Sequence, residues 1–364
     1  MKTTRILAAA LAVSLAFGAA AQTSQKLSAG KANDYGLIYS LPVTGLDIYI
    51  EAELNEEHPG EFHNYAKRHL GINDAITEDK LSAGLRSVII VPRGIATDKN
   101  RQLAQFKSGT SAFITLTPEN LPLGINTDET VDKVPVQIPV AREAAPSPLE
   151  GEGARQAITS DMARSGSTAK KAELAAQRIF ELRETRSDIL SGQAENPPAD
   201  GTAMQLVLDN LAAQEAALTA MFAGTKSTRT VVEKVTVVPD SVDIDGRVIA
   251  RLSAVDGIIS PDDLSGMPIT IDVKVIEQGK LPVNEKGETK TFPKGGVAYC
   301  VPGTAMVSVK CNGRTVASAD VTLSQLGVVF GLNPALFTDK KEPYKVIFDP
   351  STGAIVELAP VGGE

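Results

Sequence analysis

The sequence contains no tryptophan, and aromatic residues make up only 4% of its 364 positions. Proteins that bind carbohydrates usually stack sugar rings on the flat faces of aromatic side chains. The scarcity of such side chains therefore counts against a glycan-binding role.

Histidine is also rare, and all three copies, His58, His63 and His69, fall within one short segment. A serine nucleophile usually needs a histidine as its base, and the chain lacks the Gly-x-Ser-x-Gly turn of many hydrolases. Two zinc-binding histidines on a helix lie four positions apart, whereas these lie five and six apart with no cysteine nearby. We therefore assign no catalytic, cofactor-binding or metal-binding residue.

No stretch after residue 21 is long and apolar enough to span a membrane. Residues 1–21 themselves have the pattern of a secretory signal, with Lys2 and Arg5 followed by an apolar run and the small residues Ala19–Ala21. No cysteine follows the expected cleavage point, so we expect no lipid anchor there. These features predict an exported, soluble protein of the periplasm or cell envelope.

The sequence has fewer basic residues (36) than acidic residues (44), so its formal net charge is −8. Loss of the predicted signal removes two positive charges and moves the value to −10. Such a chain is repelled by nucleic acid and by anionic membrane surfaces. The partner that we expect is another envelope protein, and we expect no cofactor.

The clearest periodic segment is 169–225, which predicts a helix–loop–helix. The first helix should run from Ala169 to Leu190 and end at Gly192, a plausible left-handed cap. The second should begin at Asp200 as N-cap and close at Gly224. Two helices joined by a short loop pack antiparallel and cover each other's apolar stripes. The two stripes consist of Ala172, Ala175, Ile179, Leu182 and Ile189, and of Met204, Val207, Leu208, Leu211, Leu218 and Phe222.

Charged residues interrupt both stripes. If Leu190 lies opposite Gly201, facing residues in the hairpin have position numbers that add to about 391. This register predicts contacts of Arg178 with Glu215, of Arg183 with Asp209, and of Arg186 with Gln205. We expect these groups to fix the register of the hairpin, a known role of partly buried polar pairs.

Strand-like sequence lies on both sides of the hairpin. Alternating apolar residues or β-rich runs predict strands over 36–54 with a break at Leu41-Pro42, and over 85–92, 111–117, 134–140, 228–238 and 267–276. Turn signals predict hairpins at Asp245-Gly246, at Asn312-Gly313, and between 344–348 and 354–358.

The expected fold class is α+β, with predominantly antiparallel β units and a long antiparallel helical hairpin inserted between them. The expected division is a signal peptide at 1–21, an N-terminal β-rich domain at 22–140, a flexible linker at 141–168, the hairpin at 169–225 and a C-terminal β-rich domain at 226–364.

The chain has two cysteines, Cys300 and Cys311. The expected exported location, considered alone, predicts a disulfide between them. A tight turn at Pro302-Gly303 would instead put six residues of strand, about 20 Å, between them. Because a disulfide needs Cα atoms within about 7 Å, we predict two separate thiols.

Several short motifs are spread over most of the chain: Tyr39-Ser-Leu-Pro42, Pro59-Gly60, Tyr65-Ala66, Leu70-Gly71, the helix end from Leu182-Arg183 to Gly192, Pro198-Ala-Asp-Gly201, Arg251-Leu-Ser253 and Asp263-Leu-Ser-Gly-Met-Pro268. With them the chain resembles an uncharacterised family of exported cell-envelope proteins from Bacteroidales-type bacteria, known only as a domain of unknown function. The resemblance implies an envelope location and a β-rich fold, and it implies no activity.

Three functions remain open. The first is a non-enzymatic envelope protein that binds another protein through its sheet edges or its hairpin, or has a structural role. The second is a hydrolase with an unrecognised site, and the third is a small-ligand carrier with a cavity between β units. An exposed apolar stripe on the helices would favour the first, convergent histidines or carboxylates in a deep pocket the second, and a deep apolar pocket the third.

Overall fold

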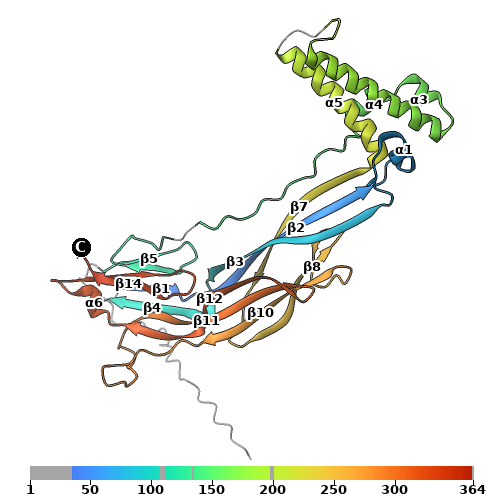
Figure 1. The fold of residues 1–364 in the computed structure, drawn as a ribbon. Coiled ribbons are helices and arrows are strands. Elements are labelled where there is room, and N and C mark those ends of the chain that lie inside the picture. Colours follow the sequence, from blue (N-terminus) through green and yellow to red (C-terminus); the bar gives the residue numbers. More distant parts are fainter. Residues whose placement is uncertain (1–34, 107–111, 133–134, 197–200, 363–364) are drawn as a thin grey trace, which may run out of the picture.

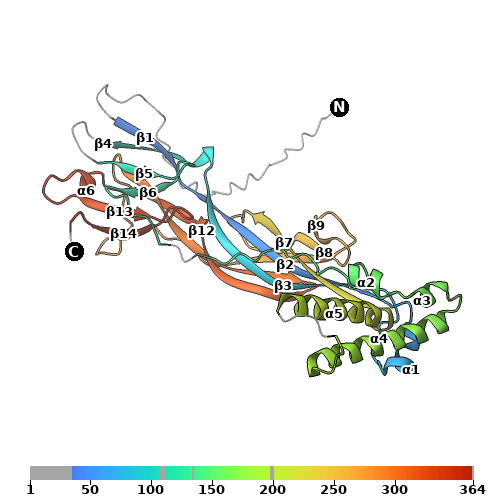
Figure 2. The same ribbon diagram turned by 90° about the horizontal axis from the view of Figure 1, so that it is seen from above.

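The computed structural model describes residues 35–106, 112–132, 135–196 and 201–362, so the predicted signal peptide lies outside the described residues. The molecule is elongated, with the helical hairpin at one end and β13 and β14 at the other (Figure 1 and Figure 2).

The strands are β1 (Tyr35–Ser40), β2 (Val43–His58), β3 (Lys80–Ile95), β4 (Arg101–Phe106), β5 (Ile114–Leu116), β6 (Pro122–Ile125), β7 (Thr225–Val237), β8 (Ile244–Ser253), β9 (Gly257–Ile259), β10 (Met267–Glu277), β11 (Val297–Cys311), β12 (Arg314–Leu332), β13 (Tyr344–Phe348) and β14 (Ile355–Pro360). The helices are α1 (Ala66–Leu70), α2 (Glu152–Ala157), α3 (Ser160–Arg164), α4 (Thr168–Ser191), α5 (Thr202–Ala223) and α6 (Ala335–Thr338), with 3-10 turns η1 (His63–Tyr65) and η2 (Asp98–Asn100).

The strands form two β units. In the central β unit, the sheet β3-β2-β7 faces the sheet β12-β11-β10-β8-β9, and their inner faces share one apolar core. In the terminal β unit, the sheets β1-β4 and β14-β13-β6-β5 enclose a second core together with the ends of β11 and β12. The pairings within these sheets are antiparallel. The α+β class, with antiparallel sheets and a long helix between strand units, is therefore confirmed.

Strand β2 shows why these residues form a sandwich. Side chains alternate between the two faces of a strand, and Leu46, Ile48 and Ile50 of β2 are fully buried in the central core. Their neighbours Asp47 and Glu51 lie on the opposite, outer face, where they contact polar groups of β3 and β7. The predicted break at Leu41-Pro42 is also present, because β1 ends at Ser40 and β2 begins at Val43.

A polar joint connects the two β units. Residues 324–327 of β12 bulge out of register with β11, and Gln325 donates from Nε2 to the carbonyls of Thr44 (2.7 Å) and Pro239 (3.0 Å). The Thr44 hydroxyl donates to the carbonyl of Ser351 at 2.9 Å, in the turn between β13 and β14. The joint thus ties β2, β12 and the β13–β14 turn together.

The strand pairing crosses the predicted division into N-terminal and C-terminal β domains. Strand β2 from the first half pairs along its length with β7 from the second half. Strand β6 from the first half pairs with β13 from the second half at Ile125–Val346 and Gly124–Ile347. Both β units therefore contain strands from both halves of the chain, and the hairpin is inserted within the central β unit.

Some local predictions also need correction. Residues 135–140 are extended but form no strand, and residue 134 lies outside the described residues. The predicted linker 141–168 contains the short helices α2 and α3. Asp245-Gly246 makes no hairpin: Gly246, at φ +61°, lies within β8 at an irregularity in its pairing with β10. The hairpins at Asn312-Gly313 and between β13 and β14 are confirmed.

The cysteines are both free, as predicted, although the expected turn between them is wrong. Pro302-Gly303 lies within β11, which runs unbroken from Val297 to Cys311 apart from a bulge. Eleven residues of strand hold Cys300 and Cys311 roughly 35 Å apart, far beyond disulfide reach.

Candidate functional site

The helical hairpin is attached to the central β unit through its second helix. The amide of Phe62 donates to the carbonyl of Met221 at 2.7 Å, and the amide of Ile76 donates to the carbonyl of Ala223 at 2.8 Å. Gly60 packs directly on this end of α5, where an added Cβ would lie 2.2 Å from the Met221 oxygen. Only glycine fits there, so the segment after β2 holds α5 tightly.

The proximal half of the hairpin, nearest the sheets, is covered by other helices of the chain. Short helices α1, α2 and α3 pack on α4 and α5, and the Phe62 ring lies 5.4 Å from the Phe222 ring. The resulting core contains Phe62, Ala66, Ala157, Met162, Ala172, Ala175, Ala176, Ile179, Leu182, Leu218 and Phe222. This half is therefore a small helical bundle with its own core.

The distal half of the hairpin lacks such a cover among the described residues. The buried positions of α4 end at Leu182, and those of α5 begin only at Gln214. Helix α2 reaches along α5 as far as Asn210, whose side chain donates to Gln156 at 2.7 Å. One turn further on, Leu206 is 70% exposed, and Leu190 on α4 is 65% exposed.

A groove between α4 and α5 lies in this distal half. It has a volume of about 510 Å³ and is lined by Arg183, Arg186, Ser187, Leu190, Ser191 and Glu215. Arg183 donates from Nε to Glu215 Oε1 at 2.6 Å, and Arg186 Nη1 lies 3.9 Å from the other oxygen of Glu215. Two guanidinium groups thus share one carboxylate. We call this surface the distal hairpin surface.

The predicted end of α4 at Gly192 is confirmed, but the predicted charge pairs are wrong. Gly192 caps α4 in the left-handed conformation (φ +73°). Asp200 lies outside the described residues, and Gly201 stands at the N-cap of α5. Ten residues, Gly192 to Gly201, separate the two helices. The contacts of Arg178 with Gln214 and of Arg183 with Glu215 have position numbers that add to 392 and 398, so one constant sum does not describe the side-chain contacts.

The arginine contacts differ accordingly. Arg178 reaches Glu181 on its own helix at 3.1 Å and Gln214 at 3.4 Å, whereas Glu215 binds Arg183. The expected partner of Arg183, Asp209, instead accepts a hydrogen bond from Gln205 on its own helix at 2.6 Å.

The three histidines do not converge. His58 Nδ1 lies 2.7 Å from a carboxylate oxygen of Asp79, and His63 Nδ1 lies 2.8 Å from a backbone carbonyl. The ring of His69 packs edge-on against Phe222, with 6.4 Å between centroids. Within the described ranges, no group of three or more histidine, cysteine, aspartate or glutamate side chains is arranged to hold a metal ion.

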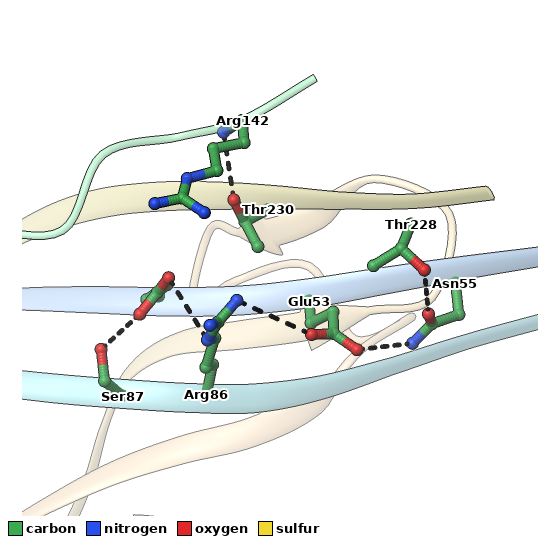
Figure 3. Close-up of polar contacts among 8 residues, drawn as sticks. Glu53, Asn55, Arg86, Ser87, Arg142, Thr228 and Thr230 are labelled. Carbon is green, nitrogen blue, oxygen red and sulfur yellow. Dashed lines mark hydrogen bonds and ion pairs between the residues drawn. The ribbon is translucent and has the colours of Figure 1, made fainter. Parts of the chain in front are cut away.

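Carboxylates gather on the outer face of the sheet β3-β2-β7 (Figure 3). Glu51 accepts a hydrogen bond from Ser87 at 2.6 Å and lies 3.8 Å from Arg86. Arg86 also reaches Glu53 at 3.9 Å, and Glu53 accepts from Asn55 at 3.2 Å. Each carboxylate therefore already has protein partners, as expected of a stabilising polar ladder rather than an acid–base pair.

Asp47 is the most enclosed member of this face, with a side chain only 5% exposed. It is held by Arg93 (3.0 Å), Lys234 (2.9 Å) and the hydroxyl of Thr236 (2.7 Å). Burial alone would raise the pKa of this carboxyl, but the bonds from Lys234 and Thr236 and the charge of Arg93 outweigh burial and lower it. The arrangement keeps Asp47 ionised and structural.

A second hollow of about 620 Å³ lies beside the terminal β unit. The rings of Phe292, Tyr299 and Phe330 meet there, with the Phe330 centroid 6.0 Å from Phe292 and 6.2 Å from Tyr299. The hollow is lined by Tyr299 and Phe330 and by polar residues of the loop between β10 and β11, including Glu288 and Lys290. No histidine lines either hollow described here.

The fold and these surfaces define a mixed α+β protein with two antiparallel β units and a projecting helical hairpin. The chain belongs to the family described as Domain of unknown function (DUF4831), whose model matches residues 35–356. No curated protein and no solved structure matches the chain. None of the helices in the described part of the chain is long and apolar enough to cross a membrane.

Proposed function

We propose that the protein is a non-enzymatic, exported envelope protein that binds a helix of another protein on its distal hairpin surface. One observation supports this proposal most strongly. The proximal half of the same two helices is covered by α1, α2 and α3, whereas the distal half continues without cover among the described residues.

The geometry favours a helix as the bound element. The apolar stripe of α5 continues distally through Leu211, Leu208 and Met204, which are only partly buried. Amphipathic helices bind by laying their apolar faces against partly exposed apolar stripes of this kind. A partner helix would extend distally the bundle that the short helices form proximally.

The charges of the groove point to an acidic residue on the partner. Arg183 and Arg186 share the single carboxylate of Glu215, which leaves one positive charge in excess. An Asp or Glu on the partner helix would pair with Arg186, the more distant of the two from Glu215. Such rim charges act mainly on specificity and association rate.

The location in the envelope is supported by the signal-like pattern of residues 1–21. An envelope location agrees with the proposed partner, because an exported protein meets other proteins of the envelope.

Affinity purification of the tagged chain with two matched variants tests the proposal. Leu190→Glu puts a charge on the distal hairpin surface, and Leu264→Glu puts the same charge on a comparably open residue, 79% exposed, between β9 and β10. We expect one protein to co-purify stoichiometrically with the wild type and with Leu264→Glu, and to be lost with Leu190→Glu. Equal recovery with both variants would exclude the hairpin as the binding surface.

A small-ligand carrier is the second candidate, supported by the hollow at Phe292, Tyr299 and Phe330. Three rings meet there, in a chain that has only 10 phenylalanine and 6 tyrosine residues. Its volume is within the range of small-molecule pockets, about 300–1,000 Å³. Quenching of tyrosine fluorescence by a bound compound, lost in Tyr299→Phe with its fold intact, would support this candidate.

A further inference from the structure

The outer edge of β7 is open along most of its length. One side of β7 pairs with β2 from Leu46 to His58. In an antiparallel strand, alternate residues direct their N–H and C=O groups to the opposite edge. For β7 these are Lys226, Thr228, Thr230, Val232, Lys234 and Thr236. Among the described residues, only Thr230 has a backbone partner there.

That partner is Arg142, in the extended segment that runs from the terminal β unit past β7 to the helices (Figure 1). The Arg142 amide donates to the Thr230 carbonyl at 3.0 Å, and the Thr230 amide donates to the Arg142 carbonyl at 2.8 Å. The Arg142 amide also reaches the Thr230 hydroxyl at 3.0 Å (Figure 3). This is one complete rung of an antiparallel ladder.

The segment before Arg142 has the sequence pattern of an edge strand. Continuing the same register places Val140 opposite Val232, Ile138 opposite Lys234 and Val136 opposite Thr236. These three residues would turn their N–H groups toward β7, and each has an N–H to donate.

The prolines occupy the alternate positions of this segment, between the residues whose N–H groups would face β7. Pro135 and Pro139 fall on positions whose N–H would point away from β7, where no donor is needed. Proline is tolerated in sheets on the outward side of an edge strand, where it also blocks pairing with further chains. The next proline, Pro146, falls on a position whose N–H would have to donate to β7. Proline has no N–H, so the ladder has to end at Ala144.

We propose that residues 136–144 are a latent fourth strand of the sheet β3-β2-β7 that closes onto the β7 edge from the Arg142–Thr230 rung. The structure records the open position, with one rung made and Val136, Ile138 and Val140 exposed. On closing, their side chains join the outer face beside Val232 and Lys234, because directly paired residues lie on the same face. The closed strand hides the edge that an extended segment of another chain would otherwise pair with. This inference does not depend on the partner of the hairpin.

Amide hydrogen exchange of the full chain, followed residue by residue by NMR, tests the closure. The reporters are the edge-facing amides of Val232, Lys234 and Thr236, and the amides of Val231 and Glu233, which face β2, are the internal reference. Ile138→Pro removes a donor to β7, whereas Gln137→Pro removes an outward one. Ile138→Ala shortens the side chain but keeps the donor.

We expect the three edge amides to exchange at least about ten-fold more slowly in the wild type, Gln137→Pro and Ile138→Ala than in Ile138→Pro. The reference amides should be unchanged in all four proteins. Equal exchange of the edge amides in wild type and Ile138→Pro would overturn the proposal, as would equal disruption by the two proline variants. Protection that rises with protein concentration would also overturn it, since the strand would then come from a second molecule.

Discussion

Arg183 on α4 donates a 2.6 Å hydrogen bond to Glu215 on α5, at the level where the buried core of the hairpin gives way to its open distal half. The pair joins the two helices, and Arg186 approaches the same carboxylate at 3.9 Å. Because Glu215 is the only acid among the described residues that line this groove, it sets how much positive charge they present to a partner.

Glu215→Gln should change the stability of the isolated protein only slightly. The Arg183 side chain is about half exposed, and pairs of this kind contribute up to about 1 kcal/mol. Urea unfolding of the variant measures the free-energy difference, with Glu181→Gln, which loses the exposed contact to Arg178, as the control. A loss well above about 2 kcal/mol for Glu215→Gln alone would mean that the pair holds the hairpin together.

The two halves of the hairpin should respond differently to truncation. Leu182→Ala removes a fully enclosed side chain from the proximal core and should cost about 2–5 kcal/mol. Leu206→Ala removes an exposed side chain and should stay within about 0.5 kcal/mol. Denaturant unfolding of both variants measures this difference. Equal losses would show that the distal half is buried in the isolated chain.

Asp47 and its partners Arg93, Lys234 and Thr236 should make the free energy of unfolding depend on pH. The pKa of Asp47 is lower in the folded protein than its usual value of 3.8, so its contribution is complete above about pH 4 and is lost as the pH falls through the folded pKa. Asp47→Asn should cost about 1–3 kcal/mol at pH 7, because Arg93 and Lys234 lose their common partner. Unfolding measured from pH 7 down to pH 2 should then show a smaller acid loss in the variant. Parallel curves for the two proteins would contradict this account.

The thiols should differ in reactivity in the folded protein. Burial raises the pKa of the Cys300 thiol to about 12 and also raises that of Cys311, which is only partly buried. Iodoacetamide should therefore label Cys311 slowly and Cys300 hardly at all, since the thiolate is the reactive form. In denaturant without reductant, mass spectrometry should show both cysteines labelled. An unlabelled pair in a monomeric chain would contradict the distance along β11.

Two local signals in the sequence predicted local structure correctly, whereas the turn signals at Asp245-Gly246 and Pro302-Gly303 did not. Gly192 marks the end of α4 because its left-handed conformation suits glycine. Asn312 and Gly313 both have positive φ, 48° and 77°, and form the turn between β11 and β12 as such a pair predicts.

Long-range pairing could not be predicted in the same way. The residues of β2 and β7 alternate correctly in each strand, but nothing in either strand shows that they pair across a separation of 167 or more residues. The short helices α2 and α3 lie in a segment interrupted by glycine, proline and serine, whose local preference for helix is weak. They are held by packing on α4 and α5, which the sequence of that segment does not reveal.

The candidate site was predictable in part. Arg183, Arg186 and Glu215 were all named in the predicted contacts between the helices, and the structure brings all three together in one groove. Their pairing was wrong because a single sum of position numbers does not determine which long side chains at neighbouring levels bind one another. The lack of cover over the distal half had no signal in the sequence, since the same stripe periodicity continues through both halves.

Site-specific photo-crosslinking in living cells tests the helix-binding proposal most directly. A photoreactive amino acid is placed at Leu190 on the distal hairpin surface or at Leu264 in the central β unit, both of them highly exposed. We predict one discrete crosslinked protein from position 190, none from position 264, and loss of the product when Arg186→Glu is added. Crosslinks of equal yield from both positions, or none from position 190 in cells that express the protein, would contradict the proposal.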